Sequence, residues 1–335
     1  MTLRGVAGAV VRVLLFVVLV PPLLLWAPAA LWFDGPASRV LAGGLAAAWI
    51  ALVILVLVRV KPLWRGGLVV VALFTLLLVW WFSIPPSNSR DWQPDVARPA
   101  HVEIQGSQVT IQNVRDFEYP PGAPPVERWE TRHYDLDRLV GVDMFLSYWG
   151  PTLICHTITS WEFSDGQHLA ISIETRKEVG EEYSAIRGFF RQFEVYYVVA
   201  DERDVIGVRA GERGETEYLY RLNVPVDGAR ALLLDYLREV DVLDNQPRWY
   251  NALTHNCTTT IRWHAREVGA DRPFDWRLVV NGFIDEMAYE RGQTDTSLPF
   301  AELRARSNVT DRARAALGDE DFPARIREGL PPRPR

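Results

Sequence analysis

Cysteine is scarce in this chain, since only Cys155 and Cys257 carry a thiol among its 335 residues. This scarcity excludes the framework of several disulfides that stabilises many small secreted domains. Two cysteines leave three alternatives open: a single disulfide bridge, one reactive thiol beside a bystander, or two inert thiols.

An excess of basic residues is also missing. The chain has 36 Lys and Arg residues against 42 Asp and Glu residues, which gives a formal net charge of -6. We find no basic stripe interleaved with aromatic residues, so no nucleic-acid partner is expected. The histidines are scattered and lack the spacing of metal ligands, so neither a metal ion nor another cofactor is expected.

Charged residues are absent from three long apolar runs, residues 13–33, 40–58 and 67–84. Each run has the roughly 20 residues that a helix needs to cross a bilayer core. The first run is too long and too rich in proline for a cleavable signal peptide. The sequence therefore predicts three transmembrane helices within residues 1–86, acting as an anchor. A lipid-presenting role is the alternative, because Pro21, Pro22 and Pro28 could bend the first helix and open a groove.

Basic residues at the ends of these runs predict their orientation. Arg4 and Arg12 precede the first run, and Arg59, Lys61 and Arg65 lie between the second and the third. Because basic loops stay on the cytoplasmic side, the N-terminus is expected in the cytoplasm. Three crossings then place the rest of the chain on the far side of the membrane, outside the cytoplasm.

The remainder of the chain has a mixed pattern of strands and helices. Residues 87–100 are polar and proline-rich, as in a connector, and residues 101–317 predict one α+β domain outside the cytoplasm. Strands are expected at residues 102–105, 109–112, 153–163, 168–175, 193–199 and 217–224, and helices at residues 229–240 and 258–268. Residues 134–149 fit either a helix or a strand. Residues 318–335 are charged and poor in large apolar groups, which predicts a flexible tail.

Cys257 is the candidate nucleophile. It lies where a polar loop meets a predicted helix, and the positive end of a helix dipole is expected to lower the pKa of a thiol there. A cysteine nucleophile also needs a base that accepts the proton of its thiol, and His156 on the strand at residues 153–163 is the best candidate. His255 is too close to Cys257 along the chain.

Glu174 is the candidate third group, which would orient the imidazole of His156. A two-residue turn at Asp165 and Gly166 would set Thr175 opposite His156. A three-residue loop ending in a left-handed Gly166 would set Glu174 there instead. The sequence leaves both registers open.

Each candidate also has a structural interpretation. Cys155 and Cys257 could be buried or bridged, and His156 could be a core histidine whose hydrogen bonds are satisfied. Glu174 could be an ion-pair partner of Arg176 or Arg187.

Several ordered motifs resemble one known family. They are residues 113–117 (NVRDF), 156–163 (HTITSWEF), 172–176 (SIETR), 201–204 (DERD) and 250–259 (YNALTHNCTT). Together they resemble the Lnb N-terminal periplasmic domain family over most of residues 92–292. That resemblance implies a circularly permuted papain-like fold, in which the histidine strand precedes the cysteine helix. It also implies Cys257 as nucleophile and His156 as its base.

The family's namesake is a bacterial lipoprotein N-acyltransferase, so the resemblance implies acyl transfer to or from a membrane lipid or a lipoprotein. It also implies that residues 101–317 form a periplasmic domain and that the chain is anchored in a bacterial inner membrane. Two alternatives stay open. One is a cysteine hydrolase or amidase that acts on cell-wall peptides. The other is a non-catalytic envelope binding module in which Cys155 and Cys257 form a disulfide.

Overall fold

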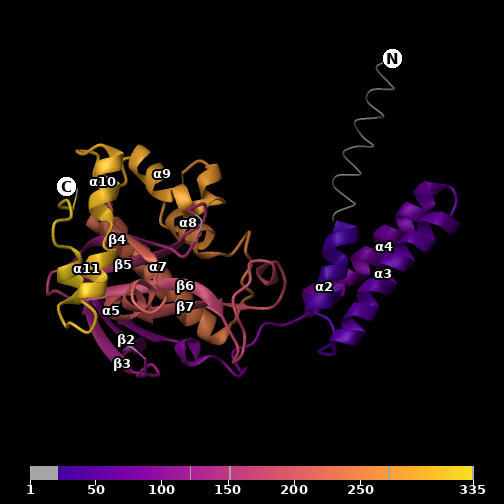
Figure 1. The fold of residues 1–335 in the computed structure, drawn as a ribbon, viewed down its shortest axis with the longest axis horizontal. Helices are drawn as coiled ribbons and strands as arrows, with labels where there is room; N and C mark the ends of the chain where they lie inside the picture. The colour runs from indigo at the N-terminus through magenta and orange to yellow at the C-terminus, as the bar shows by residue number, and fades with distance from the viewer. Residues whose placement is uncertain (1–21, 121, 151, 271, 334–335) are drawn as a thin grey trace, which may run out of the picture. The chain divides into compact units, whose positions relative to one another are not determined.

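The computed structural model describes residues 22–120, 122–150, 152–270 and 272–333. The chain divides into two compact units. One unit is helical and comprises Met1–Pro86 together with Ser184–Phe193. The other comprises Ser87–Tyr183 and Glu194–Arg335 and combines a sheet with helices, so the expected α+β class is confirmed (Figure 1).

The helical unit contains two long apolar helices. α3 (Arg39–Arg59) and α4 (Leu63–Ser83) are each 21 residues long, and both are long and apolar enough to cross a membrane. Most of their Leu, Val and Ile side chains point away from the unit, as lipid-facing side chains do. The first predicted span, residues 13–33, lies partly outside the described residues. Its described part is a π-helical turn, Pro22–Trp26, followed by α2 (Ala27–Phe33).

The segment Ser184–Phe193 packs within this helical unit. Asp34, which follows α2, accepts hydrogen bonds from Trp81 Nε1 at 2.6 Å and from Gln192 Nε2 at 2.8 Å. The ring of Phe190 stacks on Phe33 with their centroids 4.9 Å apart. The end of α2 and the end of α4 therefore lie at the same end of the helical unit.

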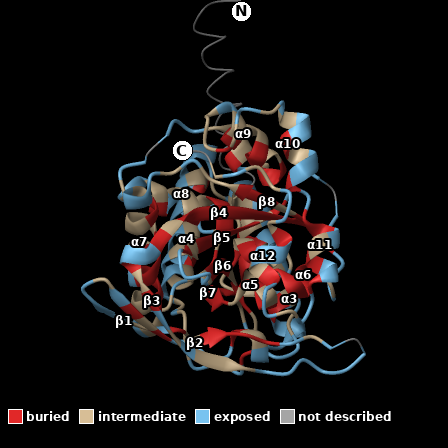
Figure 2. Cartoon of the chain, turned by 90° about the vertical axis from the view of Figure 1, so that its left-hand side faces the viewer, coloured by how far each residue is buried: buried red, intermediate tan, exposed pale blue. Residues whose placement is uncertain are grey.

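The sheet of the α+β unit contains eight strands in the order β1-β2-β7-β6-β5-β4-β8, with β3 paired to β2. The strands are β1 (His101–Gln105), β2 (Gln108–Arg115), β3 (Trp129–Asp135), β4 (Leu139–Tyr148), β5 (His156–Phe163), β6 (His168–Arg176), β7 (Glu194–Ala200) and β8 (Thr216–Arg221). Neighbours are antiparallel except β2 and β7, which are parallel. The central strands β4 to β7 are buried along most of their length (Figure 2).

Helices cover both faces of the sheet. On one face, α7 (Val226–Asn245) and α8 (Cys257–Glu267) pack over odd-numbered side chains of β5 to β7, such as Trp161 and Ile171. On the other face, the four short helices α5, α6, α11 and α12 pack over even-numbered side chains such as Ile158 and Ala170. Because side chains alternate along a strand, each strand contributes to both cores.

The bounds of the remaining helices are as follows. The four short helices are α5 (Glu202–Val205), α6 (Gly207–Ala210), α11 (Thr310–Ala315) and α12 (Phe322–Ile326). Two more, α9 (Ile284–Glu290) and α10 (Phe300–Ser307), cover β4 and β8 at their edge of the sheet. Single 3₁₀ turns occupy Pro94–Val96, Leu136–Arg138, Arg187–Phe189, Trp276–Leu278 and Asn281–Phe283.

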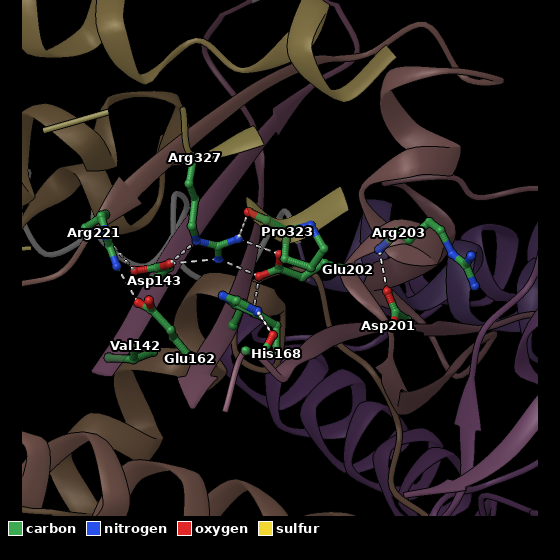
Figure 3. A network of polar contacts seen from close by, with 12 residues as sticks. Val142, Asp143, Glu162, His168, Asp201, Glu202, Arg203, Arg221, Pro323 and Arg327 are labelled. Atoms are coloured by element: carbon green, nitrogen blue, oxygen red, sulfur yellow. Dashed lines mark hydrogen bonds and ion pairs between the residues drawn. The ribbon is translucent and has the colours of Figure 1, made fainter. Parts of the chain in front are cut away.

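The C-terminal segment differs from the expectation of a flexible tail at residues 318–335. Phe322 and Ile326 are fully buried in the core. The guanidinium of Arg327 lies 2.8 Å from Asp143 and 2.7 Å from Glu202, two carboxylates that solvent does not reach (Figure 3). The composition of this segment does not predict its packing, because the segment contacts the core through Phe322, Ile326 and Arg327 and has no apolar stretch.

Arg327 completes a buried network with balanced charges. The network joins three carboxylates, Asp143, Glu162 and Glu202, to three guanidinium groups, Arg221, Arg327 and Arg333. Burial alone would raise the pKa of Glu202, but Arg327 outweighs it and lowers that pKa to about 2. The carboxylate is therefore ionised and depends on its cationic partner.

Replacing Arg327 should therefore destabilise the domain strongly. Arg327→Ala leaves the buried carboxylate of Glu202 without its paired cation, whereas Asp143 keeps Arg333, and the loss costs about 3–5 kcal/mol. Arg325→Ala is the matched control, because Arg325 belongs to an ion pair that is largely exposed, and it should change stability by less than about 0.5 kcal/mol. The measurement is the midpoint of thermal unfolding of the full-length protein in detergent. Equal midpoints for the two variants would contradict the role assigned to the network.

Candidate active site

Cys257 is the first residue of α8, and its local sequence explains why the helix begins there. The Asn256 side chain accepts a hydrogen bond from Thr259 N at 2.9 Å, and the Thr259 hydroxyl accepts one from Asn256 N at 3.0 Å. These reciprocal bonds form a capping box, which fixes the start of a helix. The expected helix at residues 258–268 is confirmed, with the thiol in its first turn.

The thiol of Cys257 is nearly closed to solvent, with the residue 9% exposed. The backbone N–H of Thr157 on β5 lies close enough to this sulfur to favour its thiolate form. Burial raises the pKa of Cys257, while this N–H, the neighbouring Thr258 and the charge of Arg209 act in the opposite direction. The expected lowering of this pKa by the helix N-terminus is therefore wrong in sign, because desolvation of the thiolate dominates.

The β5–β6 hairpin has the three-residue loop, which decides the open register. Phe163 N donates to Gln167 O at 3.0 Å, and Gly166 is left-handed with φ of 88°. Ile158 pairs with Ser172, and the same register continued by two residues sets Glu174 opposite His156. Both side chains therefore lie on the same face of the sheet.

Ser172 connects His156 to Glu174. His156 Nε2 lies 2.7 Å from Ser172 Oγ, and Ser172 Oγ donates to Glu174 Oε1 at 2.8 Å. A serine hydroxyl has one proton, so Ser172 accepts from His156 and the neutral imidazole carries its proton on Nε2. Nδ1 is then the basic nitrogen, and it makes no hydrogen bond with any of the described residues.

The hydrogen-bonded residues His156, Ser172 and Glu174 form a relay, and Arg209 on α6 determines the protonation states at its two ends. It donates to Glu174 Oε1 at 2.8 Å and to Glu215 Oε2 at 3.0 Å. The pKa of Glu174 lies well below its usual value because Arg209 outweighs the opposing effect of burial. Burial, reinforced by Arg209, lowers the pKa of His156 to about 3. At neutral pH the relay therefore holds an ionised Glu174 and a neutral His156.

The structure brings His156 and Glu174 together, with 3.8 Å between His156 Nε2 and Glu174 Oε1. Cys257 lies beside the same strand end, against Thr157, the residue after His156. It belongs to the core on the opposite face of the sheet from Ser172 and Glu174. No hydrogen bond joins Cys257 to His156 in the described part of the chain.

Asn281 joins the residue before β5 to the first turn of α8 through hydrogen bonds. Its side-chain oxygen accepts from Cys155 N at 3.0 Å, and its amide donates to Cys155 O and to Thr258 Oγ1, each at 2.7 Å. Cys155 and Cys257 are both free thiols. Cys155 is buried, and desolvation followed by the proximity of Cys257 raises its pKa. This thiol is therefore protonated and packed rather than poised for reaction.

Sequence reasoning missed three residues of this arrangement: Ser172, Arg209 and Asn281. Ser172 was within reach, because it precedes Glu174 by two residues and so shares its face of the strand. Arg209 and Asn281 carry no such signal, since one lies on a four-residue helix and the other in a single 3₁₀ turn. In the described ranges, no group of three or more His, Cys, Asp or Glu side chains is arranged to hold a metal ion.

Comparison with known proteins bears on this same region. Residues 126–282 match the model of the family described as the Lnb N-terminal periplasmic domain. No curated protein and no solved structure matches the chain significantly. The matched segment contains His156, Glu174 and Cys257 but ends before Gly292 and begins after residues 113–117. The match to a family of periplasmic domains, together with two helices near the N-terminus that are long and apolar enough to cross a membrane, fits a membrane-anchored periplasmic protein.

The contact of Gly282 with the loop before Cys155 should be intolerant of a side chain. A Cβ at Gly282 would lie 1.9 Å from Thr152 O and 2.6 Å from Leu153 C. Gly282→Ala should therefore push the backbone before Cys155 aside, at a cost of about 1–3 kcal/mol. The readouts are a lower midpoint of thermal unfolding and faster alkylation of Cys155, resolved by peptide mass spectrometry.

Gly150→Ala is the matched control for this variant, because a Cβ there meets nothing within 4 Å. It should leave both readouts near those of the parent protein. If Gly282→Ala behaves like Gly150→Ala, the close approach does not constrain the site.

Proposed function

We propose that the chain is a membrane-anchored, periplasmic, thiol-dependent acyltransferase that acts on a lipid or lipoprotein substrate. The observation that carries this proposal is the meeting of two elements at one strand end. Cys257 opens α8 with its sulfur against the N–H of Thr157, and His156, the preceding residue, begins a relay through Ser172 to Glu174. The family match over residues 126–282 covers all of these groups.

The proposed reaction has two steps. The Cys257 thiol transfers its proton to Nδ1 of His156, and the sulfur attacks the carbonyl carbon of an ester. The carbon–oxygen bond breaks, the imidazolium returns the proton to the leaving alcohol, and an acyl-thioester remains on Cys257. An amine then attacks the thioester carbon, the carbon–sulfur bond breaks as the amide forms, and His156 passes the proton of the amine to the leaving thiolate, which restores both residues.

The position of His156 at the very start of β5 supports its role as the base. Its strand is paired to β6 only from Ile158 onward, so His156 lies beyond the ladder with that neighbour. Hydrogen bonds in an unoccupied active site are commonly longer than those in the substrate complex. Nδ1 of His156 is the free nitrogen, so it is the atom available to Cys257 while Ser172 holds Nε2.

The proposed donor and acceptor follow from the anchor and from the resemblance. A domain tied to membrane helices meets bilayer substrates at a high effective concentration, which favours a lipid or a lipoprotein. Basic residues between the predicted spans support a cytoplasmic N-terminus and a periplasmic domain. α3 and α4 would then serve both as an anchor and as a way of holding Cys257 near its substrate.

The proposal predicts a covalent adduct on Cys257. Incubation of the full-length protein with phospholipid vesicles should add the mass of one acyl chain, which hydroxylamine should remove because it cleaves thioesters. Cys257→Ser should form no thioester adduct. His156→Ala should slow its formation by about 10²–10⁴-fold, the usual contribution of a positioned base.

Cys155→Ser is the matched control for the second thiol and should retain most of the adduct formation. Equal loss in Cys155→Ser and Cys257→Ser would contradict a single nucleophile. If cell-wall peptides rather than phospholipids acylate Cys257, the reaction is that of an amidase and the lipid substrate is wrong. An absence of adduct from either substrate class under turnover conditions would contradict acyl transfer.

A further inference from the structure

Glu217 on β8 is a carboxyl group that the proposed mechanism does not use. Its side chain is fully buried, and Oε2 accepts a hydrogen bond from Ser147 Oγ at 2.7 Å. Oε1 has no hydrogen-bond partner within the described residues. A buried carboxyl with one unpaired oxygen is unusual and calls for a physical explanation.

The sheet register connects Glu217 to His156. Glu217 pairs with Ser147 across β8 and β4, and Ser147 pairs with His156 across β4 and β5. Directly opposed residues of antiparallel strands project from the same face, so these three side chains form one row. Two strand spacings separate Glu217 from His156, which is about 10 Å.

The charged groups facing Glu217 leave it without a cation of its own. Arg209 on α6 is already shared between Glu174 and Glu215. Arg213 acts on Glu217 only as a more distant charge, and α11 contributes the uncharged Thr310 hydroxyl, which bonds to the backbone of Glu217. The buried cation nearest to Glu217 is therefore already paired with two other carboxyl groups.

Burial raises the pKa of Glu217 to about 8, while Arg209 and the Ser147 hydrogen bond oppose the rise. The carboxyl is thus neutral at neutral pH and becomes charged just above it. The pKa of His156 is lowered, since burial and Arg209 disfavour its imidazolium. A negative charge in the same row would stabilise the imidazolium and raise this pKa.

We propose that Glu217 is a positioning residue whose loss of a proton makes His156 a stronger base for Cys257. This inference rests on the proposed roles of those two residues. As pH rises, the Glu217 carboxyl gives its proton to water and becomes a carboxylate. The Cys257 S–H bond then breaks more readily, because the N–H bond formed on His156 yields an imidazolium that faces a new negative charge.

The size of the effect follows from Coulomb's law. Two charges about 10 Å apart at an effective dielectric constant of roughly 20 shift a pKa by about one unit. The carboxylate also disfavours the thiolate, but less, because Cys257 belongs to the core on the other face of the sheet. The net gain in the thiolate–imidazolium pair is therefore roughly threefold to tenfold.

The test is the rate of acyl-adduct formation on Cys257 from phospholipid as a function of pH, because His156 acts as the base in that step. Full-length protein in detergent is compared with Glu217→Gln between about pH 6.5 and 9.5, and peptide mass spectrometry resolves Cys257 from Cys155. The ratio of the two rates, parent over variant, should rise roughly threefold to tenfold with a midpoint near pH 8. A purely structural role for Glu217 would give a ratio that does not change with pH.

Ser147→Ala provides a second variant that keeps the carboxyl. It removes the hydrogen bond that favours the ionised form of Glu217, so the midpoint of the rise should move to higher pH. This shift tests the inference even where Glu217→Gln fails to fold. An unmoved midpoint in Ser147→Ala would overturn it.

His156→Ala separates this inference from the proposed function. If that variant leaves adduct formation on Cys257 unchanged at every pH, or if the parent protein forms no adduct, the proposed pairing of His156 with Cys257 is wrong and the inference falls with it. If His156→Ala slows adduct formation but the ratio for Glu217→Gln stays flat, the proposed function stands and the role of Glu217 is wrong.

Discussion

The pairing of β5 with β6 is the constraint on which the candidate site depends. The loop between these strands contains three residues, and its last one, Gly166, adopts a left-handed conformation that other residues rarely accept. This loop sets Ile158 against Ser172 and so brings Ser172 and Glu174 to the side of His156. A shift of one residue would turn Glu174 to the other face of the sheet, and the imidazole would lose its relay.

The sheet also separates two electrostatic environments. The face that carries His156 holds buried charges in two groups, one around Arg209 and one around Arg327. On the opposite face, Cys257 lies among aromatic and aliphatic side chains. Burial is the first cause of both pKa shifts, since it disfavours the imidazolium of His156 and the thiolate of Cys257. The fixed charge of Arg209 reinforces burial at the imidazole but opposes it at the thiol.

Much of the local structure could be predicted from sequence, because it depends on short-range patterns. The β5–β6 hairpin and α8 have alternation, a turn dipeptide and a capping box in their own residues. β4 was left undecided because it is buried on both faces, and such a strand lacks the alternation that distinguishes it from a helix. The packing of residues 322–327 could not be predicted, since it depends on buried carboxylates from distant strands.

The candidate site could be predicted only in part. The sequence limits the residue opposite His156 to Glu174 or Thr175, and the hydrogen bonds of the loop between β5 and β6 decide for Glu174. The charge around the site was not predictable, because Arg209, Glu215 and Glu217 are brought to the imidazole only by tertiary structure. Sequence also misjudged the thiol pKa, since a helix N-terminus can be read from sequence whereas the burial of one sulfur cannot.

The raised pKa of Cys257 bears on how a reactive thiol persists in an oxidising compartment. Oxidants attack the thiolate, so a buried and protonated sulfur reacts slowly with them. The neutral state of His156 has the same effect, because an imidazolium beside the sulfur would favour the thiolate. Substrate that fills the site can supply the carbonyl carbon at the moment the proton moves to His156, so that the thiolate forms only where it is used. Burial thus serves the proposed chemistry by keeping the resting thiol inert, whereas a permanently lowered pKa would expose it to oxidation between turnovers.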